Sequence, residues 1–141
     1  IMGERTHFSP SVIEMIERIE NTTSAGDKLT LVLAFNYSSR REIMLAAQSL
    51  AQRVASGEMG VEDINEEALS ASLMTANIPD PDFIIRTSGE CRLSNFLLWQ
   101  ASYAEFYFPE TLWPDFDEEA FDRALEVYAE RDRRYGLVTE D

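Results

Sequence analysis

An almost unbroken apolar run at residues 29–35, Leu-Thr-Leu-Val-Leu-Ala-Phe, constrains the fold of this chain more than any other segment. The run has the length of a strand, and a strand that is apolar on both faces must be covered on both. A second strand-length run lies at residues 82–86, and segments with helical spacing of apolar residues surround the two runs. This alternation predicts an α/β fold with a central, largely parallel sheet flanked by helices.

Apolar spacing and capping residues place the helices. We expect helices at residues 10–23, 40–56, 65–74 and 94–103, and one that begins after Asp117 and has Arg131, Arg133 and Arg134 in its last turn. Residues 94–103 are apolar nearly all round, so we expect that helix to be buried centrally. A short strand is expected at residues 105–108.

The charge and the cysteine count exclude several classes of protein. The chain has 26 Asp and Glu residues against 12 Lys and Arg, a net charge of −14, so we expect no nucleic-acid partner and at most peripheral membrane association. The single cysteine, Cys91, excludes an internal disulfide and an all-cysteine zinc site, and fits a reducing cytoplasm. With 141 residues the chain has the size of one domain.

Residues 82–96, Asp-Phe-Ile-Ile-Arg-Thr-Ser-Gly-Glu-Cys-Arg-Leu-Ser-Asn-Phe, concentrate the chemistry of the chain. The expected strand delivers Arg86 at its carboxyl end, a glycine-containing loop carries Arg92, and Ser94 caps the helix expected next. Two guanidinium groups, a hydroxyl group and a helix N-terminus together form a plausible phosphate cradle.

A structural alternative stands beside each of these roles. The two arginines can pair with Glu90, Glu105 or other carboxylates, in which case Ser94 only caps a helix, and the residues alone leave both interpretations open. Glu105 can bind magnesium beside a phosphate site or form a structural ion pair. Cys91 lacks a companion base, so we do not expect it to act as a nucleophile.

Three blocks of sequence carry a resemblance to a known family. The main block runs from Arg86-Thr-Ser-Gly-Glu-Cys-Arg-Leu-Ser-Asn-Phe-Leu-Leu-Trp-Gln100 through Tyr103-Ala-Glu105 to Leu112-Trp-Pro-Asp-Phe116. Leu29-Thr-Leu with Asn36-Tyr37 and Arg40 precedes it, and Arg131-Asp-Arg-Arg-Tyr-Gly136 follows it. In this order the blocks resemble the cis-prenyltransferases, most closely the bacterial undecaprenyl diphosphate synthases. The resemblance identifies residues 1–141 as the C-terminal portion of a single catalytic domain.

The resemblance implies an enzyme and its ligands. Members of the family condense an allylic diphosphate, here expected to be farnesyl diphosphate, with successive isopentenyl diphosphates, using magnesium and forming cis double bonds. The implied product is a polyprenyl diphosphate, expected to be undecaprenyl diphosphate, for the carrier lipid of bacterial cell-wall assembly. The family also implies a cytoplasmic homodimer.

The resemblance assigns roles in the substrate site and at the dimer contact. Arg86, Arg92 and Ser94 would hold the diphosphate of isopentenyl diphosphate, Glu105 matches an acidic residue linked to the magnesium site, and Glu90 matches a residue associated with the dimer contact.

Two further assignments concern the product and the partner subunit. Leu29 and Phe35 share one face of their expected strand and resemble tunnel-floor positions that limit product length. Arg134, in Arg134-Tyr135-Gly136, resembles the arginine of an Arg-x-Gly motif that reaches across the dimer to the partner's isopentenyl diphosphate.

The chain departs from the family pattern in three places. It contains no His…Met-Asp-Gly-Asn-Gly-Arg-Trp-like motif, so we expect the main catalytic aspartate upstream of Ile1 and no activity from the fragment alone. Cys91 stands where some members carry histidine, and Ser38-Ser39 replaces Gly-Gly. Two rival functions remain: a catalytically silent partner subunit of the same fold that acts as a binding protein, and an unrelated anion-binding α/β protein.

Overall fold

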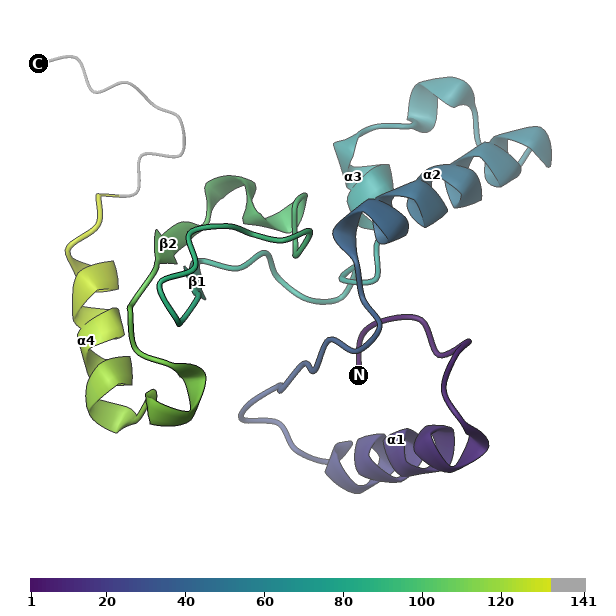
Figure 1. The fold of residues 1–141 in the computed structure, drawn as a ribbon. Coiled ribbons are helices and arrows are strands. Elements are labelled where there is room, and N and C mark those ends of the chain that lie inside the picture. Colours follow the sequence, from purple (N-terminus) through teal and green to yellow (C-terminus); the bar gives the residue numbers. More distant parts are fainter. Residues whose placement is uncertain (133–141) are drawn as a thin grey trace, which may run out of the picture. The chain divides into compact units, whose positions relative to one another are not determined.

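The computed structural model describes residues 1–132, which form two compact units (Figure 1). The first unit is Ile1–Ile78, and the second begins at Pro79. That residues 1–141 belong to a single catalytic domain stays a prediction. Within residues 1–132, no helix combines the length and the apolar character that a bilayer span requires.

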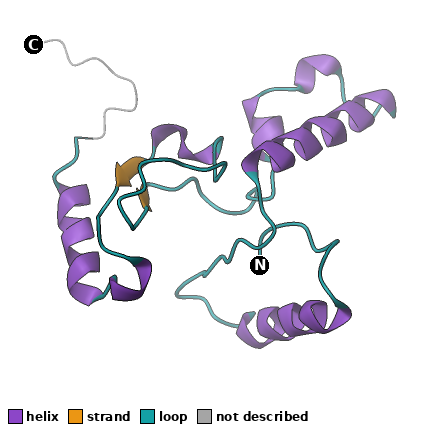
Figure 2. Ribbon diagram, viewed as in Figure 1, coloured by secondary structure: helices purple, strands orange, loops and turns teal. Residues whose placement is uncertain are grey.

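The first unit is built from helices (Figure 2). Its elements are α1 (Pro10–Thr23), α2 (Ser39–Ala55), a 3-10 turn (Val61–Asp63) and α3 (Glu66–Ser70). The three α-helices confirm the helices expected there, although α3 is shorter than predicted. Asn65 caps α3 as expected, because its Oδ1 accepts the N–H of Ala68 at 2.8 Å.

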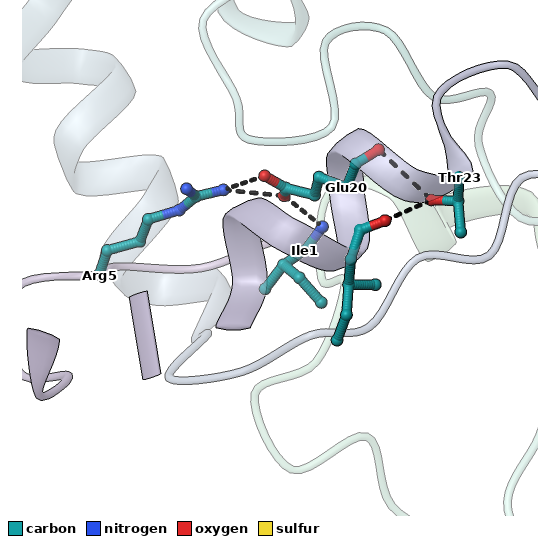
Figure 3. A network of polar contacts seen from close by, with 5 residues as sticks. Ile1, Arg5, Glu20 and Thr23 are labelled. Atoms are coloured by element: carbon teal, nitrogen blue, oxygen red, sulfur yellow. Dashed lines mark hydrogen bonds and ion pairs between the residues drawn. The ribbon is translucent and has the colours of Figure 1, made fainter. Parts of the chain in front are cut away.

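Polar contacts of Glu20 hold α1 against the segment that precedes it (Figure 3). Its carboxylate accepts hydrogen bonds from Nη2 of Arg5 at 2.8 and 3.0 Å and from the nitrogen of Ile1 at 3.0 Å. At the end of the helix, Oγ1 of Thr23 donates to the carbonyl oxygen of Ile19 at 2.9 Å. Ile16 is the buried residue of this helix.

A buried carboxylate joins α2 to the segment after α3. Glu42 is 1 % exposed, and its Oε2 accepts the N–H of Met74 at 3.0 Å. Its Oε1 accepts a hydrogen bond from the hydroxyl group of Tyr37. Ala46, Leu50 and Leu73 are buried in the same unit. A buried charge is stable only when hydrogen bonds replace its water, and these two donors supply them.

The strand predicted for residues 29–35 does not form, and this prediction is wrong for the described structure. An isolated parallel bridge joins Met2 to Ala34, and the Leu29 and Phe35 side chains are 86 % and 50 % exposed. A strand needs neighbouring strands and an apolar cover on its faces. The first unit supplies only two backbone hydrogen bonds between Met2 and residues 33–35.

The second unit contains the sheet. Strand β1 (Phe83–Ile85) pairs in parallel with β2 (Glu105–Tyr107), so the strands predicted for residues 82–86 and 105–108, and the parallel arrangement, are confirmed. Helix α4 (Glu118–Ala129) begins as predicted, since Oδ1 of Asp117 accepts the N–H of Ala120 at 3.0 Å. The ring of Tyr128 on α4 lies 5.0 Å from that of Phe83, which packs the helix against the sheet.

The buried helix predicted for residues 94–103 is wrong. Ser94, Asn95 and Leu97 have positive φ angles, and only a 3-10 helix at Gln100–Tyr103 follows. A helix of this length is marginal by itself and depends on the packing of its apolar side chains. In the second unit Phe96 and Leu98 are 38 % and 40 % exposed, so much of that packing is missing.

Candidate functional site

The loop that follows β1 is tied by its backbone to the chain that follows β2. The N–H groups of Arg86, Ser88 and Gly89 donate to the carbonyl oxygens of Tyr107, Thr111 and Pro109 at 2.9, 2.8 and 2.8 Å. The first bond continues the parallel pairing one residue beyond β1, and the other two tie the loop to residues 109 and 111. They fix where the side chain of Arg86 leaves the sheet, at the carboxyl end of β1, where ligands bind in open α/β sheets.

Arg86 lacks the structural partner that the alternative interpretation gave it. Its side chain is partly buried, and within residues 1–132 no carboxylate forms an ion pair with it. This is unexpected in a chain with 26 acidic residues. A partly buried guanidinium group without a counter-ion is a candidate to bind an anion, because it carries five N–H donors and no acceptor.

Arg92 and Ser94 are arranged differently. Arg92 forms an ion pair with Glu90, as the structural alternative foresaw, and its side chain is 63 % exposed. Ser94 is exposed, has a φ of 49°, and does not cap a helix, because no helix begins there. The predicted phosphate cradle therefore lacks a helix N-terminus. The donors that remain in the cradle are the side chains of Arg86, Arg92 and Ser94.

Glu105 is held by a residue that the sequence analysis assigned elsewhere. Its Oε2 lies 3.9 Å from Nε of Arg131, and its side chain is 28 % exposed. Because α4 ends at Ala129, Arg131 follows the helix and does not lie in its last turn, which corrects the prediction. Glu105 opposes Phe83 in the sheet, so it lies at the other end of the paired strands from Arg86. The separation along the strands is about 10 Å.

The carboxylates of the described residues do not form a complete metal site by themselves. In the described part of the chain, no three His, Cys, Asp or Glu side chains gather into a group that could hold a metal ion. Magnesium is commonly bound by one or two carboxylates together with substrate phosphates and water. A single carboxylate such as that of Glu105 is compatible with a magnesium ion that is shared with a diphosphate, to which it would supply one oxygen ligand.

Four further residues were singled out in the sequence: Leu29, Phe35, Cys91 and Arg134. Cys91 is exposed, and its Sγ lies 3.7 Å from the carbonyl oxygen of Gly89, an arrangement without a base. Leu29 and Phe35 belong to the first unit. Arg134 lies outside the described residues.

Two residues with specific contacts were missed by sequence reasoning. Arg131 was expected in the last turn of the last helix, and no local spacing links it to Glu105, which lies 26 positions earlier. Glu42 was not singled out in the sequence, although it is buried. The sequence around Glu42 gives no signal of its burial, because Met74, whose N–H it accepts, is distant in sequence.

A known protein family matches the whole described part of the chain. Residues 1–136 match the prenyltransferase family described as "Putative undecaprenyl diphosphate synthase". The isoprenyl transferase of Agrobacterium fabrum is 51 % identical over 140 residues, which are 99 % of this chain and 57 % of the relative. The isoprenyl transferase of Bacillus subtilis is 46 % identical over 138 residues, 98 % of this chain and 53 % of the relative.

A solved structure confirms the fold class. Lavandulyl diphosphate synthase from Lavandula x intermedia, in complex with dimethylallyl diphosphate, superposes with a TM-score of 0.92 and 37 % identity, over 96 % of this chain and 58 % of that one. The chain spans about half the length of the curated relatives that it matches. The chain belongs to the undecaprenyl diphosphate synthase family of prenyltransferases.

Proposed function

We propose that the full-length protein containing this chain is a cis-prenyl chain-elongating enzyme. In each cycle it condenses isopentenyl diphosphate with an allylic diphosphate, for which farnesyl diphosphate is the proposed primer. The allylic carbon–oxygen bond to diphosphate breaks, a carbon–carbon bond to the isopentenyl unit forms, and that unit loses a proton. The proposed product is undecaprenyl diphosphate for the carrier lipid of cell-wall assembly.

The partly buried guanidinium group of Arg86, without a carboxylate partner in residues 1–132, is the observation that carries this proposal. Its position at the carboxyl end of β1 suits a ligand that is an anion. Charge-assisted hydrogen bonds from a planar guanidinium group to phosphate oxygens are strong and directional. Arg86 thus binds the diphosphate and orients the isopentenyl unit toward the allylic carbon.

Arg92 and Ser94 complete the proposed site from the exposed side of the loop. Arg92 exchanges Glu90 for a phosphate oxygen when the ligand binds, and Ser94 donates its hydroxyl group to another. When bound at Glu105, magnesium would supply positive charge that stabilises the diphosphate. The proposal includes a cytoplasmic homodimer, in which Glu90 lies near the dimer contact and Arg134 reaches the partner's substrate.

The proposal is tested with the full-length protein and radiolabelled isopentenyl diphosphate, with and without farnesyl diphosphate and magnesium. We expect a long apolar product only when all three are present. Binding of isopentenyl diphosphate without product would favour the silent partner subunit. Neither binding nor product in a folded protein would contradict the proposed function.

A further inference from the structure

Arg131 lies beside Glu105 and has both a backbone contact and a side-chain contact. Its backbone N–H donates to the carbonyl oxygen of Tyr128 at 3.0 Å, and its Nε lies 3.9 Å from Oε2 of Glu105. The side chains of Arg131 and Glu105 are 48 % and 28 % exposed, so solvent reaches the pair. Surface pairs of this kind contribute little by themselves unless the fold holds both partners in place.

The packing of α4 supplies that constraint. Tyr128 lies three residues before Arg131, and its ring packs against Phe83 at 5.0 Å. Phe83 is the residue that opposes Glu105 in the parallel pairing of β1 and β2. The aromatic contact and the ion pair therefore lie side by side at the amino end of the sheet. The packing of Tyr128 on Phe83 brings Arg131 to the carboxylate of Glu105.

We propose that Arg131 is a positioning residue that sets the affinity of Glu105 for a divalent cation. The inference rests on the proposed function, in which Glu105 contributes to a magnesium site. A guanidinium group beside the carboxylate competes with a metal ion for the same oxygen atoms, and its charge repels the incoming cation. Arg131 thus orients Glu105 while no cation is bound and must release it when one arrives.

A purely structural role makes a different prediction. If Arg131 served only the dipole of α4, replacing it would change the stability of the protein and leave metal affinity unchanged. Arg123 on α4 offers a matched control, because its Nη2 lies 3.3 Å from Oε1 of Glu119 in an exposed pair. Glu119 is not part of the proposed metal site.

The experiment measures Mn²⁺ binding to the full-length protein in the presence of isopentenyl diphosphate, with free Mn²⁺ followed by electron paramagnetic resonance. We expect Arg131→Gln to bind Mn²⁺ about two- to fivefold more tightly than the unmodified protein, since a competing charge is lost. Arg131→Lys and Arg123→Gln should bind as the unmodified protein does. If Arg131→Gln does not fold, Arg131→Met keeps the aliphatic stem and replaces it.

The Glu105→Gln variant separates the metal role of Glu105 from the positioning role of Arg131. Should it leave Mn²⁺ binding unchanged, Glu105 is not a metal ligand, and this part of the proposed function fails together with the inference. Should Glu105→Gln weaken binding while Arg131→Gln leaves it unchanged or weakens it, the metal role stands and the role of Arg131 is overturned.

Discussion

Arg41 holds Glu4 through two parallel hydrogen bonds. Nε of Arg41 donates to Oε1 of Glu4 at 2.9 Å, and Nη2 donates to Oε2 at 3.0 Å. The pair connects the segment before α1 to the first turn of α2. Hydrogen bonds from Arg41, followed by its charge, lower the pKa of the Glu4 carboxyl group below its usual range. The same hydrogen bonds raise the pKa of Arg41.

A fall in pH should therefore lower the stability of the first unit, because protonation of Glu4 weakens its pairing with Arg41. A carboxyl group whose pKa is lowered by folding stabilises the folded state above its unfolded pKa, and that contribution is lost as the pH falls through the folded pKa. We expect Arg41→Gln to show a shallower loss of stability on acidification than the unmodified protein, measured by urea unfolding at successive pH values. Arg53→Gln, which breaks the exposed pair with Glu58, is the control. Equal slopes for the Arg41 variant and the unmodified protein would contradict this assignment.

Gly3 is required by a close approach of two backbone segments. Its φ is +127°, and a Cβ atom there would lie 1.8 Å from the carbonyl oxygen of Phe35. Gly3→Ala should lower the free energy of unfolding by about 2–4 kcal/mol. The backbone must move to relieve the clash, and a residue with a side chain is also strained at this φ. Gly57 has a φ of +76° with nothing within 4 Å, so Gly57→Ala should cost only about 1 kcal/mol. Chemical denaturation of both variants checks the order, and equal losses would count against the clash.

Local signals predicted the parts of the fold that local physics determines. Asn65 and Asp117 cap helices as expected, because a capping oxygen and the N–H groups it accepts lie within one turn of chain. The apolar segments at residues 29–35 and 94–103 were predicted as buried elements, yet burial depends on distant partners. Residues 1–132 do not supply enough of those partners. The pairing of Glu105 with Arg131 was likewise invisible, since it follows from the packing of Tyr128 on Phe83.

The predicted role of Phe35 in limiting product length can be tested against a residue on the opposite face of its segment. Phe35→Ala should lengthen the products of the full-length enzyme, because removal of the ring leaves room for further isoprene units. Val32 lies on the other face of an extended chain, so Val32→Ala should leave the product length unchanged. Thin-layer chromatography of the extracted products compares the two variants. An identical distribution for Phe35→Ala and the unmodified enzyme would remove the tunnel-floor assignment.

The proposed role of Arg134 in a partner subunit's site is tested by mixing defective subunits. A guanidinium fork can grip a phosphate as an ammonium group cannot, so we expect Arg134→Lys to impair catalysis while Arg131→Lys does not. Subunits with Arg134→Ala, mixed with subunits lacking both Arg86 and Arg92, should form heterodimers with one doubly defective site and one intact site. Such heterodimers should recover up to about half of the normal activity. No recovery, although heterodimers form, would show that Arg134 serves its own subunit.

The KM for isopentenyl diphosphate in the Arg86→Ala variant of the full-length enzyme tests the central claim most directly. Loss of a partly buried charged contact should cost about 2–4 kcal/mol, which is roughly a 30- to 1,000-fold increase in KM. Arg92→Ala should also raise KM, by less, because the Arg92 side chain is 63 % exposed and has Glu90 as an alternative partner. Arg53→Ala, at an exposed pair in the first unit, should leave KM unchanged. An unchanged KM in folded Arg86→Ala and Arg92→Ala variants would contradict the diphosphate site.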